Sequence, residues 1–256
     1  SPPAARSSRS FPRSRSLPRS RLWPYGIGLC AIFTGLLGAT TAVLAHNVSS
    51  ADANFLSSQS GLLFWAYGYL GAKHMVTGVD HLLFLAGVIF YLRQFRDVLT
   101  YVTLFAAGHS ITLLLGVLLQ INANAFLVDA VIGFSVVYKA FENLGGLRHL
   151  RYSLDAKRAV LLFGFCHGLG LATKLQQLQL AQEGLLGNLL AFNIGIELGQ
   201  LFALSGLVLL IFSWRRFPRF DQHAIVINVL LMSAGLVLMA TQVTGYCIST
   251  NSCLTS

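Results

Sequence analysis

The sequence contains few charged residues: Asp, Glu, Lys and Arg together make up 11% of its 256 residues, whereas hydrophobic residues make up 55%. This composition argues against a soluble globular enzyme. Basic residues outnumber acidic ones by 18 to 9, but six arginines lie in the first 22 residues, and the remaining twelve basic residues exceed the acids by only three. The chain therefore lacks the broad basic surface that would predict nucleic-acid binding.

Motifs of several enzyme classes are also absent. The chain contains no Walker loop, no Gly-x-Ser-x-Gly, no His-Glu-x-x-His and no Cys-x-x-Cys, so a thiolate zinc site has no support. Of the four cysteines, Cys30 and Cys166 fall in apolar segments, and Cys247 and Cys253 share the C-terminal tail. A disulfide between the last two is one expectation in an oxidising compartment.

The N-terminal region divides into a leader, an apolar segment and a loop. Residues 1–22 are rich in Ser, Pro and Arg and contain no acid, so we expect a disordered basic leader. The apolar segment 23–45 ends in small residues of the kind that signal peptidase reads, and it is predicted either as a cleaved signal peptide or as a first transmembrane helix. The acid-free leader also allows an organellar transit peptide. Residues 46–60 are predicted as an outer loop.

Six further apolar segments follow, each long enough to cross a hydrocarbon core of about 30 Å as a helix. They span residues 61–92, 98–120, 124–145, 158–176, 185–213 and 224–246. We therefore predict an all-α, polytopic membrane protein with a six-helix membrane domain at 61–246 and an outer tail at 247–256. It would have seven crossings, or six if the first is removed.

The Lys and Arg residues of the connecting segments predict the orientation. Fifteen of the eighteen lie in the leader and in alternate connectors, one lies in the other connectors, and two fall within helices. Short cytoplasmic loops hold the excess of Lys and Arg, so we expect the N-terminus inside and the C-terminus outside. The expected location is a bacterial cytoplasmic membrane, with an organellar membrane as the alternative.

Ionisable side chains inside the predicted helices are costly in hydrocarbon, so they should face a bundle interior or a water-filled cavity. The candidates that we select are His74, Asp80, His81, His109, His167 and Glu197. Histidines and acids on facing helices suit a divalent transition metal such as nickel, cobalt, zinc or copper. For His109 alone, an interhelical hydrogen bond is an equal alternative.

The spacing of the first two histidines adds a constraint. His74 and His81 are seven residues apart, about 10.5 Å along a straight helix, so they could not share one ion. Either the backbone opens at Thr77-Gly78 and brings them together, or they belong to two levels of a pathway. Asp80 and His81 differ by about 100° around the helix, so one can bind metal while the other supports it.

Several strings resemble motifs of the HupE/UreJ family over about residues 61–245. They are His74-x5-Asp80-His81, His109-Ser110 with Thr112, Phe163-Gly164-Phe165 with His167-Gly168, and Phe192-Asn193 with Glu197-Leu198-Gly199-Gln200. The resemblance implies a small nickel or cobalt permease. It also implies that His74, Asp80 and His81 recognise the metal, while His109, His167 and Glu197 match further family positions.

We therefore predict a secondary permease for nickel or cobalt rather than an enzyme, with no catalytic residue. The first alternative is an intramembrane zinc hydrolase in which His81, His109 and His167 hold zinc while Asp80 or Glu197 acts on bound water. The second is a metal-holding or structural subunit of a larger membrane complex. The expected partners are the lipid bilayer, the metal ion, and a second copy of the chain or a membrane complex.

Overall fold

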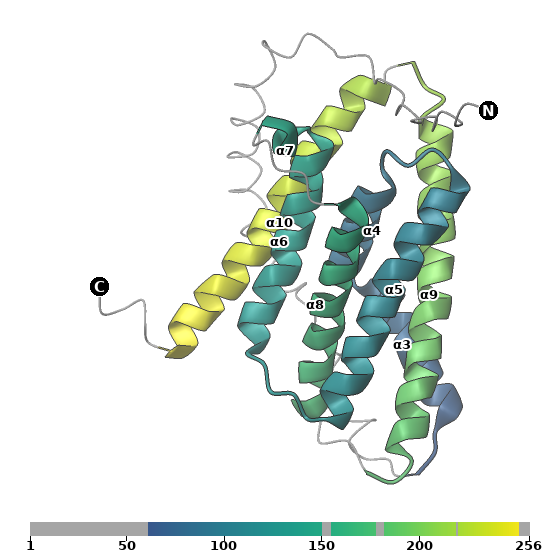
Figure 1. Cartoon of the computed structure of the whole chain (residues 1–256), viewed down its shortest axis with the longest axis vertical. Coiled ribbons are helices and arrows are strands. Elements are labelled where there is room, and N and C mark those ends of the chain that lie inside the picture. The colour runs from purple at the N-terminus through teal and green to yellow at the C-terminus, as the bar shows by residue number, and fades with distance from the viewer. Residues whose placement is uncertain (1–60, 150–154, 178–181, 219, 251–256) are drawn as a thin grey trace, which may run out of the picture.

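The computed structural model describes residues 61–149, 155–177, 182–218 and 220–250, and in these ranges the chain contains helices and no strands (Figure 1). The helices are α3 (Phe64–Thr77), α4 (Val79–Ile89), α5 (Phe95–Leu118), α6 (Ala125–Asn143), α7 (Gly146–His149), α8 (Ala156–Gln177), α9 (Leu185–Trp214) and α10 (Phe220–Thr250). The all-α prediction is thus confirmed for this part of the chain. The predicted leader, the segment 23–45 and the loop 46–60 lie outside the described residues.

The observed helices follow the predicted apolar segments closely. α8 and α9 begin and end within two residues of the segments predicted at 158–176 and 185–213. α10 is longer than its predicted segment at both ends and continues to Thr250, so residues 247–250 of the predicted tail are helical. Cys247 of this helix takes part in a disulfide, whereas Cys166 is a free thiol. Cys253 lies outside the described residues, so its pairing with Cys247 stays a prediction.

Length and composition suit a multi-pass membrane protein. Within the described ranges, four helices, α5, α8, α9 and α10, are long and apolar enough to cross a membrane. The outward faces of the bundle carry large apolar side chains, among which Trp65 is 87% exposed and Phe202 75% exposed. Apolar surface of this extent is unfavourable in water and is matched by lipid tails.

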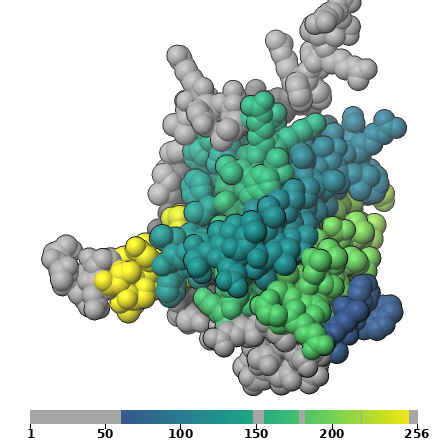
Figure 2. Space-filling model, turned by 60° about the horizontal axis from the view of Figure 1, so that its bottom comes forward, coloured from purple at the N-terminus to yellow at the C-terminus, as the bar shows by residue number. Residues whose placement is uncertain are grey.

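The long helices associate in three pairs: α3 with α9 and α5 with α8 run parallel, and α6 with α10 run antiparallel. Glycines allow the backbones of each pair to approach closely. A Cβ atom at Gly199 of α9 would lie 2.6 Å from the carbonyl oxygen of Ala72, and one at Gly164 of α8 would lie 2.6 Å from that of Phe105. Small residues serve this purpose in membrane bundles. In Figures 1 and 2, α10 and α3 lie on opposite sides of the bundle.

The first predicted segment is broken into α3 and α4 at Gly78. The backbone of Gly78 is extended (φ −69°, ψ 96°), and its N–H donates to the carbonyl oxygen of His74 over 2.8 Å. A Cβ atom at Gly78 would lie 2.9 Å from that oxygen and 3.0 Å from Nδ1 of His81, so a larger residue would crowd both. The backbone therefore opens at Thr77-Gly78, as in one of the two arrangements that the sequence allows.

Arg215, at the end of α9, holds the end of α4 in place. Its guanidinium donates to the carbonyl oxygens of Ile89 (3.2 Å), Phe90 and Leu92. The last carbonyls of a helix have no partner within the helix, and a cation is favoured beside them by the helix dipole. α4 is therefore tied to α9 at one end and joined to α3 by the break at the other.

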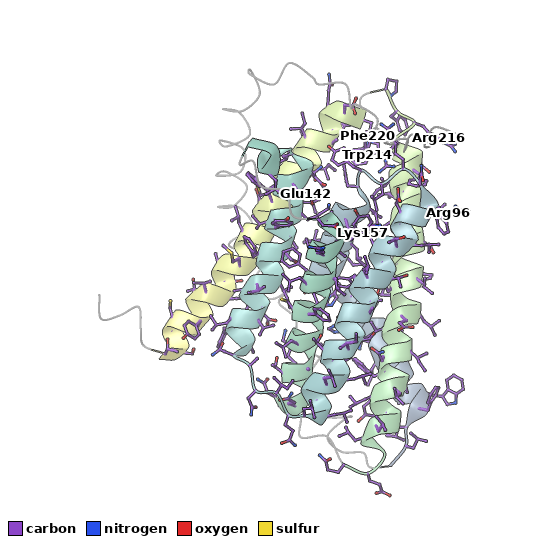
Figure 3. The ribbon with its side chains drawn as sticks, viewed as in Figure 1. Arg96, Glu142, Lys157, Trp214, Arg216 and Phe220 are labelled. Carbon is purple, nitrogen blue, oxygen red and sulfur yellow. The ribbon has the colours of Figure 1, made fainter. Side chains whose placement is uncertain are left out.

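The basic side chains of the connectors gather at one end of the bundle. Figure 3 labels Arg96, Lys157 and Arg216 at this end, which we call the arginine-rich end. The described connecting residues at the opposite end, 119–124 and 182–184, contain no Lys or Arg. The charge asymmetry expected from the sequence is thus a property of the folded bundle.

Asn188 fixes the start of α3 at the end opposite the arginines. Its side-chain oxygen accepts from the N–H of Leu63 (2.7 Å), and its amide group donates to the carbonyl oxygen of Gly61 (2.8 Å). Asn188→Ala should therefore lower the stability of the bundle by about 1–3 kcal/mol, because two partly buried backbone groups would lose their side-chain partner. A thermal unfolding temperature in detergent equal to that of the wild-type protein would contradict this role.

Candidate metal site

Three histidine rings surround His81, which follows directly after the helix break. The centroid of the His81 ring lies 4.9 Å from that of His167 on α8, 5.3 Å from that of His74 on α3 and 5.5 Å from that of His109 on α5. The four side chains come from four different helices. Of the two arrangements that the sequence allows for His74 and His81, the structure shows the one in which the break brings them together.

The four histidines lie at the same depth in the bundle. His74 comes ten residues after the start of α3, and His109 and His167 come nine and ten residues before the ends of α5 and α8. All of these helix ends lie opposite the arginine-rich end, and ten residues correspond to about 15 Å. This is roughly half of a hydrocarbon core of about 30 Å. We call these four residues the histidine layer.

Hydrogen bonds set the tautomers of two rings in the layer. Nδ1 of His81 lies 3.1 Å from Oδ1 of Asp80, and Nδ1 of His167 lies 2.7 Å from the carbonyl oxygen of Phe163. A carbonyl or carboxylate oxygen can only accept, so Nδ1 carries the hydrogen in each neutral ring. Nε2 then keeps the lone pair that a metal ion requires, and an acceptor behind the ring is the usual support of a metal-bound histidine.

The four histidines of the layer differ in how deeply they are buried. His81, His109 and His167 are each 1% exposed, as is Asp80, whereas His74 is only partly buried. Within the described residues, neither ring nitrogen of His109 has a hydrogen-bond partner. The interhelical hydrogen bond that was the alternative for His109 is therefore not observed. Buried polar atoms in this state are uncommon and unfavourable, which suits a group that receives a ligand.

The layer is not a preformed coordination shell. Among the described residues, no three His, Cys, Asp or Glu side chains are placed to hold one metal ion. Because the donor atoms are not placed in this way, the rings would have to turn before the nitrogens of three of them could share an ion at a bond length such as the about 2.0–2.1 Å of zinc–nitrogen bonds. The structure thus offers several ligands at one depth.

Glu197 does not join the histidine layer. Gly195 and Gly199 face α3 on the inner side of α9, and Glu197, midway between them in sequence, is turned outward and exposed. A step of two residues rotates a side chain by about 200° around a helix, which explains the opposite direction. The part of Glu197 in a metal track stays a prediction.

Other charged groups of the membrane helices are paired with each other. Nζ of Lys139 lies 2.7 Å from Glu142 within α6, and Nζ of Lys174 on α8 lies 2.9 Å from Asp129 on α6. Partly buried ion pairs of this kind satisfy both charges and need no ligand. Asp80 is therefore the acidic residue that the described structure places against the histidine layer.

Phenylalanines beside the histidine layer were missed in the sequence analysis. The rings of Phe84 and Phe105 lie 5.4 and 5.0 Å from that of His167, and Phe105 lies 6.1 Å from both His81 and His109. A signal was present, because each phenylalanine is three or four residues from a histidine on its own helix and so shares its face. In an apolar segment rich in phenylalanine, that spacing did not stand out.

Comparison with known proteins identifies the family. A family model described as HupE / UreJ protein matches residues 50–250, a range that includes every described helix and all six candidate residues. No curated protein and no solved structure matches the chain. The match confirms the resemblance found in the motifs, and the chain belongs to the HupE/UreJ family.

Proposed function

We propose that the protein is a secondary permease that carries a divalent transition-metal ion, nickel or cobalt, through the histidine layer. The observation that supports this most directly is the layer itself, in which imidazoles from four helices meet at mid-depth beside a helix break. Broken helices at this depth form the ion sites of many transporters, and imidazole suits nickel and cobalt. The HupE/UreJ family is linked to nickel and cobalt transport, which favours a transport role over catalysis.

The charge asymmetry of the bundle supports an orientation. Because cytoplasmic loops carry the excess of Lys and Arg, the arginine-rich end would face the cytoplasm, with the N-terminus inside and the C-terminus outside. The described helices then supply six of the proposed seven crossings, with α3 and α4 counted as one. The membrane would be the cytoplasmic membrane of a bacterium.

The different burial of the histidines supports an order of contact. His74 is the most exposed member of the layer, so an ion that enters the bundle would meet it before the buried His81. Asp80 would hold the His81 ring with Nε2 ready to bind. The ion would then pass to His109 and His167 by exchange of one nitrogen for another. A shared site that is not preformed fits this role, because conduction needs binding weak enough to release the ion.

Uptake into proteoliposomes tests the proposal. Vesicles that contain the purified protein should accumulate radiolabelled Ni²⁺ or Co²⁺ faster than vesicles without protein. His223→Ala is a matched control, because His223 is an exposed histidine whose ring stacks 5.9 Å from Trp214, close to the arginine-rich end, and its loss should leave uptake unchanged. A protein that takes up no metal but retains one equivalent tightly would overturn the permease and favour a metal-holding subunit or a zinc hydrolase.

Asp80→Asn should weaken metal binding by about 10–100-fold, the usual cost of removing the acceptor behind a metal-bound histidine. An amide can donate to Nδ1 of His81, which places the hydrogen on Nε2 and removes the lone pair. The concentration dependence of metal uptake measures the change.

Asp129→Asn provides the control for Asp80→Asn. Asp129 is also an acid in a membrane helix, partly buried where Asp80 is fully buried, but it pairs with Lys174 rather than with a histidine. The metal concentration for half-maximal uptake should stay at the wild-type value in this variant. Equal losses in the two variants would show that total negative charge, and not the orientation of His81, governs binding.

A further inference from the structure

The three most deeply buried histidines share a pattern on their helices. On each helix a phenylalanine lies one turn from the histidine, on the side of the arginine-rich end. A valine lies one turn beyond the phenylalanine in the same direction. The phenylalanines are Phe84, Phe105 and Phe163, and the valines are Val88, Val102 and Val160. α4 runs towards the arginine-rich end, whereas α5 and α8 run away from it, so the steps are forward on α4 and backward on the other two.

The three phenylalanines, which we call the phenylalanine layer, meet around Phe84, whose ring contacts the other two across the helices. The ring of Phe84 lies 5.3 Å from that of Phe105 and 5.7 Å from that of Phe163. Phe84 and Phe105 are completely buried, and Phe163 is 8% exposed. The rings offer an ion neither a lone pair nor a hydrogen bond. The axis between α4, α5 and α8 is thus apolar on the arginine-rich side of the histidine layer.

We propose that the phenylalanine layer is the gate that closes the metal pathway on the arginine-rich side, an inference that rests on the proposed transport function. An apolar constriction excludes water, and an ion cannot pass until the constriction widens or wets. The histidine layer would accordingly be separated from the arginine-rich end in the conformation described.

Contacts between the two layers give the gate a means of responding to metal. His167 packs against Phe84 (5.4 Å) and Phe105 (5.0 Å), and its Nδ1 is bonded to the backbone of Phe163. One histidine therefore touches all three helices at the level of the gate. If its ring turns to bring Nε2 to an ion, the rings of Phe84 and Phe105 that pack against it would have to shift as well, because side chains in protein cores interdigitate with few voids between them.

Chemical modification of a cysteine in the histidine layer tests the gate without relying on transport. We would replace the four native cysteines by serine and introduce His109→Cys as the reporter. In sealed membrane vesicles of known orientation, a membrane-impermeant methanethiosulfonate added from the arginine-rich side should react slowly. Phe84→Asn or Phe105→Asn should raise the rate from that side by about tenfold or more, since a polar side chain hydrates the constriction. The rate from the opposite side should not change.

Two further variants separate a gate from ordinary packing. Phe84→Leu keeps the constriction apolar, so the reaction should stay slow. Phe90→Asn alters an equally buried phenylalanine that stacks on Phe220, away from the layer, and should also leave the rate low. A rate that is unchanged in Phe84→Asn and Phe105→Asn, or that rises equally from both sides, would overturn the gate. Because the readout is thiol modification, these outcomes are distinct from a failure of metal uptake, which would overturn the permease instead.

Discussion

His81→Ala is expected to abolish metal uptake in proteoliposomes, with a larger loss than the roughly 10–100-fold expected for Asp80→Asn. His81 is the ring that the other three histidines of the layer share, with centroid distances of 4.9 to 5.5 Å. Its loss would remove the central nitrogen and separate His74 on one side from His109 and His167 on the other. Initial rates of radiolabelled Ni²⁺ and Co²⁺ uptake measure the effect.

A loss of uptake in His81→Ala reports on the metal pathway only if the variant remains folded. Its unfolding temperature in detergent should be compared with that of Phe84→Ala, which leaves a larger void in the same part of the core and so is expected to be the less stable of the two. Even a residue that only supports a metal ligand is expected to cost about 10–100-fold. If a folded His81→Ala variant takes up metal within about threefold of the wild-type rate, the metal pathway lies elsewhere in the bundle.

Gly195→Val is expected to prevent assembly of the bundle, the largest effect on stability that we predict. A Cβ atom at this position would overlap the carbonyl oxygen of Gly68 and lie 2.7 Å from its carbon and 3.0 Å from the amide nitrogen of Ala72. These are backbone atoms of α3, which cannot turn aside as a side chain can. The cost should reach or exceed about 3 kcal/mol, the upper end for overpacked sites. Loss of the monodisperse peak in gel filtration would report it.

Gly206→Val supplies the matched control on the same helix. Among the described residues, and apart from the adjoining backbone of α9 itself, no atom lies within 4 Å of a Cβ placed at Gly206. Both variants replace a glycine of α9 by valine, so a general effect of valine on this helix would appear in both. Gly206→Val should change stability by no more than about 0.5 kcal/mol. Similar losses in the two variants would show that the approach of α3 and α9 is not what limits assembly.

The sequence predicts the helices well, because apolar length is a direct requirement of the bilayer. For the first segment it leaves two arrangements open, a break at Thr77-Gly78 or two levels of a pathway, because a straight helix would hold His74 and His81 about 10.5 Å apart. The family motifs identify four histidines and Asp80 that the structure brings together. Each of these features can be recognised within a single segment of the sequence, or from the order in which the motifs follow one another along the chain.

Features that depend on the rotation of a helix against its neighbours could not be predicted in the same way. Nothing in the sequence shows that the glycine-bearing face of α9 turns towards α3, and this contact is what leaves Glu197 exposed. The phenylalanine layer required the opposite directions of α4 and α5 to be known, because only then do Phe84 and Phe105 meet at one level.

The parallel pairing of α3 with α9 has a consequence for biosynthesis. The partner of α3 begins at Leu185, more than one hundred residues after α3 ends at Thr77. At a synthesis rate of about 5–20 residues per second, the ribosome needs roughly 5–20 s to reach it. During this interval α3 presents its glycines to lipid or to the insertion machinery. His74 therefore reaches its final place only after the helices that carry the other three histidines have been made.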